Sequence, residues 1–222
     1  FETIIDGGYY YADKTSFIRP VLTSGSYVQL ITRPRRFGKS LFLETLREFL
    51  EISAAHPGDA SRQKRLFHGL NVLEDEAFCK RFMGQHPVLH VSFHAVAGED
   101  FNAARAALAD AFQEIAAKNA CLLSSPRLNE EDKSFLRDCS SRKYLRNAEN
   151  LQDLKGFLKQ MLMMMAKHFE RQAVLLIDEY DVPLKHAAVK GYYNAMVDLM
   201  RSELAFLKSG GTLLNNKPAV MK

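Results

Sequence analysis

Apolar residues gather in three short runs that have the character of buried strands. The runs are YVQLIT at 27–32, PVLHVSF at 87–93 and AVLLIDEYD at 173–181. The third run is almost continuously apolar until its acidic end, as expected of a parallel strand covered on both faces. PAVMK at 218–222 is expected to open a fourth strand that the sequence does not finish.

Residues with helical spacing fill much of the chain between these runs. The predicted helices cover 13–25, 40–52, 101–120, 151–169 and 191–208, and the polar stretch 124–150 is expected to hold only short helical pieces. Pro20 fits the first helix only in its opening turn, where no hydrogen bond to an earlier carbonyl is lost. The run MLMMM at 161–165 is expected to fill core rather than to bind a ligand. Strands that alternate with helices predict a layered α/β fold.

The composition limits where this protein works. The chain has 222 residues, of which 47% are hydrophobic, so it can bury a sizeable core. No apolar run approaches the roughly 20 residues that cross a bilayer, and FETIIDGGYY at the start lacks the features of a secretory signal. We therefore expect a cytoplasmic protein without membrane contact. Three scattered cysteines fit no disulfide or metal pattern and are expected to be buried or half-buried thiols, namely Cys79, Cys121 and Cys139.

The charge is mildly basic and is concentrated in two clusters. A net charge of +4 is compatible with nucleic-acid contact but too small to indicate it. One cluster surrounds a single loop and consists of Arg33, Arg35 and Arg36. The other is expected to be a solvated helix face and consists of Arg62, Lys64 and Arg65.

The loop RPRRFGKS at 33–40 lies between the first apolar run and a predicted helix. Strand, loop and helix in this order form the context of a phosphate-binding loop, whose usual pattern is G-x-x-x-x-G-K-[ST]. Gly38 would let the backbone approach phosphate, Lys39 would reach the β- and γ-phosphates, and Ser40 would offer its hydroxyl to Mg²⁺. An arginine replaces the usual first glycine, and the following proline would stiffen the turn. The predicted nucleotide-binding residues are Arg33, Pro34, Arg35, Arg36, Phe37, Gly38, Lys39, Ser40 and Leu41.

A second motif, VLLIDEYD, ends the third apolar run. Asp178 is predicted to hold Mg²⁺ through its water shell, and Glu179 to orient and deprotonate an attacking water. The alternative is a strand that merely ends in two solvated acids. The presence of both motifs in one chain favours a nucleotide site, with Lys39 and Glu179 as the predicted catalytic residues and with Ser40 and Asp178 as the predicted metal residues.

With these motifs the chain resembles the bacterial AAA-ATPase-like family. The resemblance rests on YYADKT at 10–15, RPRRFGKS at 33–40 and LIDEYDVPL at 176–184, and it extends to LFHGLNV at 66–72 and GYYNAMVDLMR at 191–201. An arginine in place of the first glycine is usual in that family.

The resemblance implies a three-layer P-loop NTPase fold of the additional-strand catalytic-glutamate type. In that type the fourth strand lies between the first and the third. A helical insert would separate the second and third strands, and the chain would stop at the fourth core strand. Members often carry a nuclease-like PD-(D/E)XK domain beyond this point. One domain over 1–222 is expected. Its parts are a lead-in and helix, the phosphate loop between two strands, a helical region, and the metal-binding strand with a helix and the start of the fourth strand, at 1–26, 27–100, 101–170 and 171–222.

The function indicated is Mg-dependent ATP binding and slow hydrolysis by a module of a larger bacterial protein. A nucleotide-gated switch with little turnover would use the same loop and remains an alternative. A second alternative is a nucleic-acid-associated module coupled to a nuclease-like domain, which would have a nucleic acid or protein partner. A small-molecule kinase is less favoured, because an Asp-Glu pair on the metal strand is unusual for one. No N-K-x-D stretch specifies guanine, which favours adenine.

Two side-chain hypotheses accompany this interpretation. Arg35 or Arg36 should face phosphate or an acid such as Asp178 or Glu179 when the site is empty. Tyr10 or Tyr11 could stack on adenine, although anchoring of the N-terminus to the core is the favoured role.

Overall fold

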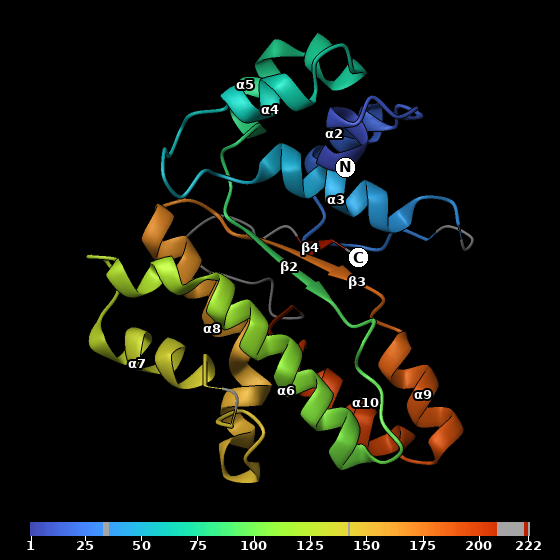
Figure 1. Ribbon diagram of the computed structural model, residues 1–222, viewed down its shortest axis with the longest axis vertical. Helices are drawn as coiled ribbons and strands as arrows, with labels where there is room; N and C mark the ends of the chain where they lie inside the picture. Colours follow the sequence, from blue (N-terminus) through green and yellow to red (C-terminus); the bar gives the residue numbers. More distant parts are fainter. Residues whose placement is uncertain (33–35, 142, 208–219, 222) are drawn as a thin grey trace.

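Figure 1 shows the computed structural model of the protein, which describes residues 1–32, 36–141, 143–207 and 220–221. Three predicted site residues, Arg33, Pro34 and Arg35, lie outside the described residues. The α-helices are α1 (Glu2–Asp6), α2 (Ile18–Thr23), α3 (Lys39–Leu50), α4 (Ser61–Leu66), α5 (Glu76–Phe82), α6 (Phe101–Lys118), α7 (Glu130–Cys139), α8 (Leu151–Phe169), α9 (Val182–Lys190) and α10 (Tyr193–Glu203). No helix in the described part of the chain is both long and apolar enough to cross a bilayer.

Among the described residues, four strands form one parallel sheet. Its strands are β1 (Val28–Gln29), β2 (Val88–Ser92), β3 (Val174–Asp178) and β4 (Val220–Met221). The spatial order is β1-β4-β3-β2, so β4 lies between β1 and β3, as expected. In the register of β2 against β3, Val88 pairs with Val174 and Ser92 with Asp178. The carboxyl ends of β2 and β3 therefore reach the same edge of the sheet.

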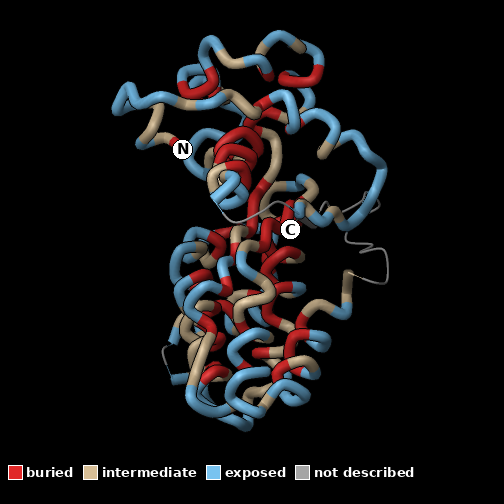
Figure 2. Tube along the Cα trace, turned by 90° about the vertical axis from the view of Figure 1, so that its right-hand side faces the viewer, coloured by how far each residue is buried: buried red, intermediate tan, exposed pale blue. Residues whose placement is uncertain are grey.

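Helices cover both faces of this sheet, and alternate residues of β3 face two different cores. Val174 and Leu176 pack with α3 and the N-terminal segments, whereas Leu175 and Ile177 pack with α6, α8 and α10. Figure 1 shows α2 to α5 on one side of the strands and α6, α7, α8 and α10 on the other. Figure 2 shows buried residues inside both layers. The architecture is therefore α/β, and the strands are buried because both sides are covered.

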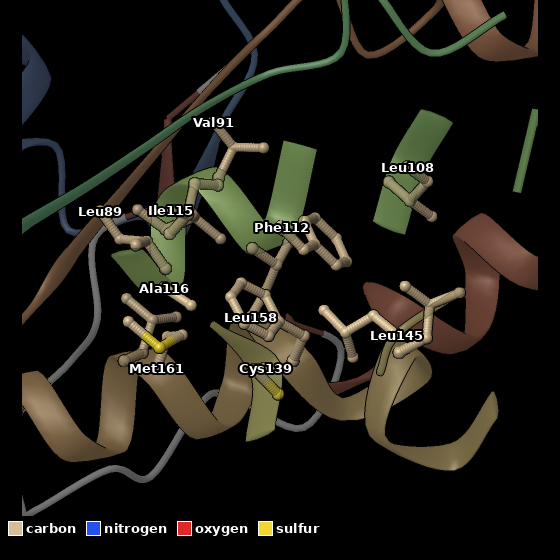
Figure 3. Packing of buried hydrophobic residues seen from close by; sticks show 14 of the residues in the cluster. Leu89, Val91, Leu108, Phe112, Ile115, Ala116, Cys139, Leu145, Leu158 and Met161 are labelled. Carbon is tan, nitrogen blue, oxygen red and sulfur yellow. The ribbon is translucent and has the colours of Figure 1, made fainter. Parts of the chain in front are cut away.

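The larger core lies between the sheet and the helical region. The aromatic rings of Phe112 in α6 and Phe157 in α8 stack with centroids 4.6 Å apart. Met161, Met164 and Met165 are buried here, which confirms that the methionine run fills core. Figure 3 shows residues from three elements meeting in this core, namely Leu89, Val91, Phe112, Ile115, Leu158 and Met161.

The strongly periodic helices agree with their predictions, whereas several weaker elements differ. Residues 15–17 form a 3-10 turn before α2, in which Pro20 is the third residue and therefore lies in the first turn. The first strand is much shorter than the predicted 27–32, because Tyr27, Val28 and Leu30 are exposed and only two residues pair with β4.

The helix α9 was not predicted, and the helix predicted over 191–208 is α10, which starts at Tyr193 and ends at Glu203. Only Pro183 and Ala187 of α9 are buried, so the helix carries almost no apolar periodicity in its sequence.

Two predictions about side chains need correction. Cys79 and Cys139 are buried free thiols, and burial raises the pKa of Cys139 to about 12, but Cys121 is exposed. The second basic cluster is not simply solvated. Arg62 forms ion pairs with Glu2 and Glu48, and Arg65 pairs with Glu2 and Asp6, so that these side chains tie α4 to α1 and α3; Lys64 is exposed.

Candidate functional site

The loop before α3 ends in a left-handed turn. Gly38 has φ 75° and ψ 30°, a conformation that costs glycine nothing, and Arg36 also has a positive φ of 67°. The helix α3 begins directly at Lys39, and the Phe42 N–H donates to the Gly38 carbonyl at 2.9 Å. No side chain caps this helix start among the described residues, so the first backbone N–H groups of α3 are available to an anion.

The carboxyl end of β3 brings Asp178 and Glu179 to the same edge of the sheet. The Phe93 N–H, just past β2, donates to the Asp178 carbonyl at 3.0 Å. The Glu179 N–H donates to Asp178 Oδ1 at 3.0 Å, and Glu179 has a left-handed φ of 56°. A non-glycine residue in that region costs on the order of 1–3 kcal/mol and is concentrated at functional sites.

A cavity of about 970 Å³ lies between α3 and α9. Its size is at the upper end of ordinary small-molecule sites. Five predicted residues from the loop and the start of α3 line it together with Glu179, and those five are Arg36, Gly38, Lys39, Ser40 and Leu41. Phe37 is exposed and does not line this cavity.

A smaller cavity of about 200 Å³ adjoins the first. Asp178 lines only this smaller one, while Lys39, Glu179 and Asp181 line both. The structure therefore places Lys39, Asp178 and Glu179 around two adjoining cavities.

The charges around these cavities are partly paired. Asp181 forms a hydrogen-bonded ion pair with Lys185 four residues later on α9. That bond, with a further contribution from the positive charge of Lys39, holds the pKa of Asp181 below its usual range. Neither Lys39 nor Arg36 has an ion-pair partner within the described ranges. Because Arg35 lies outside those ranges, the acidic partner expected for Arg35 or Arg36 stays a prediction.

Another cavity, of about 240 Å³, also borders the loop. It is lined by the aromatic lead-in and by residues around the helix start, namely Tyr10, Tyr11, Ala12, Lys14, Gly38, Leu41 and Phe42. Tyr11 is half-buried, with its ring edge-on to Phe1 at 5.2 Å and its hydroxyl 3.3 Å from Thr45 Oγ1. The anchoring role is thus confirmed for Tyr11, whereas Tyr10 is 93% exposed.

Comparison with known proteins identifies the family of this chain. The family model described as "Predicted AAA-ATPase" (AAA-ATPase_like) matches residues 1–217. The chain belongs to this AAA-ATPase-like family.

A curated relative matches a shorter part of the chain. The "Uncharacterized protein in vnfD 5'region" of Azotobacter chroococcum mcd 1 is 39% identical over 94 residues, which are 42% of this chain and 15% of that protein. No solved structure matches the chain.

Some residues of the site in this AAA-ATPase-like chain were not found from sequence. His94, Lys185, His186 and Lys190 also line the large cavity. His94 follows β2, and the rule that ligands bind at the carboxyl ends of parallel strands could have indicated it. The other three lie on α9, whose position became visible only in the fold.

The described residues contain no group of three or more His, Cys, Asp or Glu side chains that could hold a metal ion.

Proposed function

We propose that this chain is a P-loop nucleotide-binding module that binds Mg-ATP and hydrolyses it slowly. The observation that carries the proposal is that Gly38, Lys39 and Ser40, at the start of α3, share one cavity with Glu179 at the end of β3. The strand order β1-β4-β3-β2 also fits the additional-strand catalytic-glutamate type of P-loop fold. Membership of the AAA-ATPase-like family supports the nucleotide as ligand.

Phosphate binding would use the backbone first. The uncapped N–H groups at the start of α3 and the positive end of the helix dipole attract anionic oxygens. Lys39 is exposed, and its ammonium group has no competing ion pair among the described side chains. This combination favours a polyphosphate over a neutral ligand.

The side chains present fit a Mg²⁺ ion held mainly by its ligand. Mg²⁺ keeps several waters and is commonly bound through one or two carboxylates and substrate phosphates. Ser40 and Asp178 offer a hydroxyl and a carboxylate at adjoining cavities. The ion would neutralise phosphate charge when bound.

Glu179 is the residue proposed to act on water. It is exposed to the large cavity, and its left-handed backbone directs it differently from Asp178, which lines only the smaller one. A carboxylate in this place would accept a proton from the attacking water. The cavity beside Tyr10 and Tyr11 is the proposed location of the adenine ring, since flat apolar faces gain from burial.

We further propose that the chain is part of a larger bacterial protein. The part of the Azotobacter relative that matches is only 15% of its length, which supports a module within a longer chain.

Titration of nucleotide with and without Mg²⁺, followed by calorimetry, tests the proposal. Wild type should bind ATP in a Mg-dependent manner. The ATP affinity of Lys39→Ala should be about tenfold to hundredfold weaker, because hydrogen bonds to charged groups contribute about 1.5–3 kcal/mol. Lys159→Ala, which removes an exposed lysine on α8, is the matched control and should bind as wild type does. ATP affinity of Lys39→Ala within about threefold of wild type would contradict the assignment.

A further inference from the structure

The segment Asp13–Lys14–Thr15 is anchored to a distant part of the chain. Asp13 Oδ1 accepts hydrogen bonds from the Thr15 N–H and hydroxyl at 2.8 and 2.7 Å, and Oδ2 accepts from the Asn71 N–H at 2.8 Å. The buried Thr15 hydroxyl oxygen accepts in turn from the Val72 N–H at 3.1 Å. Asp13 and Thr15 thus fix the segment from both sides of Lys14.

Lys14 joins this anchor to the phosphate loop. Its Nζ donates to the Phe37 carbonyl at 3.3 Å. The same Nζ lies only 3.5 Å from the place where a Cβ on Gly38 would stand. The Phe37 side chain is exposed and does not anchor the turn by packing against the core. The hydrogen bond from Lys14 therefore holds a turn that has little other support from Phe37.

The contact has a directional consequence for the loop. In a planar trans peptide the carbonyl and the next N–H point in opposite directions. A Phe37 carbonyl held toward Lys14 therefore turns the Gly38 N–H away from Lys14. The Gly38 N–H belongs to the half of the loop in which backbone donors grip phosphate.

We propose that Lys14 is a positioning residue that holds the Phe37–Gly38 peptide, through the Phe37 carbonyl, in the orientation that phosphate binding needs. The inference rests on the proposed function above, and it assigns a role to the DKT part of the YYADKT motif. Lys14 also lines the cavity beside Tyr10 and Tyr11, so a direct contact with nucleotide is the competing explanation.

Two measurements on the full chain separate these explanations. The first is the amide ¹⁵N and ¹H shift of Gly38 in nucleotide-free protein, because loss of a hydrogen bond to the preceding carbonyl moves this signal. Lys14→Met should move the Gly38 signal without a change in melting temperature. Lys14→Arg keeps a hydrogen-bond donor at this position, so its Gly38 signal should lie close to that of wild type. Lys80→Met, which removes an exposed lysine on α5, is the control and should leave the signal in place.

The second measurement is affinity for inorganic triphosphate and for ATP. Lys14→Met should weaken both to the same degree, about twofold to tenfold, as expected for one lost hydrogen bond. An unmoved Gly38 signal would overturn the proposal, as would a loss of affinity confined to ATP, which would indicate contact with the base or ribose. If wild type binds neither ligand, the proposed function fails, and the Gly38 signal alone decides whether Lys14 positions the loop.

Discussion

Asp178 and Glu179 are neighbours in sequence, but only Glu179 reaches the large cavity. Glu179 and Lys39 line both cavities, whereas Asp178 lines only the small one. The hydrogen bond from the Glu179 N–H to Asp178 Oδ1 and the left-handed φ of Glu179 keep the two carboxylates in these separate positions. Each carboxylate can therefore be altered with the other left in place.

The two substitutions should fail in different ways. Asp178→Asn should weaken Mg-dependent ATP binding, because a negative anchor near the metal is lost. Glu179→Gln should keep that binding and slow hydrolysis, since a general base contributes about 10²–10⁴-fold. Calorimetry and single-turnover phosphate release measure the two effects. An unchanged hydrolysis rate in Glu179→Gln would show that Glu179 is not the base, and a nucleotide-gated switch would then describe the protein better.

Among the elements, α4 connects the N-terminal helix α1 to α3. Arg62 lies 2.5 Å from Glu48 Oε2 on α3 and donates to Glu2 on α1 at 2.9 Å. Glu48 is buried, and its other oxygen receives the Arg47 guanidinium at 2.8 Å. A buried carboxylate with only one of these cations is poorly compensated.

Arg62→Met should therefore lower the free energy of unfolding by about 1–3 kcal/mol, the usual penalty for a buried polar group that loses its partner. Urea denaturation measures it. The control is Lys64→Met on the same helix, which removes the same charge at an exposed position. Equal stability of the two variants would show that the Arg62 ion pairs contribute nothing beyond net charge.

Elements with one strongly buried face were predictable, and those without one were not. The helices α6 and α8 lie within two residues of their predicted bounds, because their apolar spacing reflects a buried face. The sequence of α9 has too few buried residues to reveal it. In the site, local motifs identified Lys39 and Glu179, whereas the cavity residues on α9 depend on how that helix packs.

At the scale of the whole molecule, one buried carboxyl links stability to pH. Glu203 of α10 is 1% exposed, and its Oε1 accepts from the Leu158 N–H of α8 at 2.8 Å. Its Oε2 has no hydrogen-bond partner among the described residues. Burial raises the pKa of Glu203 to about 8. At a pH between the unfolded pKa and this raised value, the folded protein therefore holds a proton at Glu203 that the unfolded chain has released.

The stabilisation from this proton is complete below the unfolded pKa of about 4.3 and is lost as the pH rises through the folded value. The stability of wild type relative to Glu203→Gln should fall between pH 5 and pH 8, by up to about 1.4 kcal/mol per pH unit. Urea denaturation of both proteins at each pH measures this difference. The histidines are common to both proteins, so their contributions to the pH dependence cancel. Parallel stability curves would show that Glu203 stays ionised in the folded protein.

The strand order has a consequence for how the protein folds during translation. The only sheet partner of β1 among the described strands is β4, the last element of the described chain. Domains fold while they leave the ribosome, from the N-terminus onward. The strand β1 is thus synthesised early, but its partner β4 is synthesised only after nearly all of these residues. A nascent chain should therefore complete the sheet beside the proposed phosphate loop late, after both helical layers have formed.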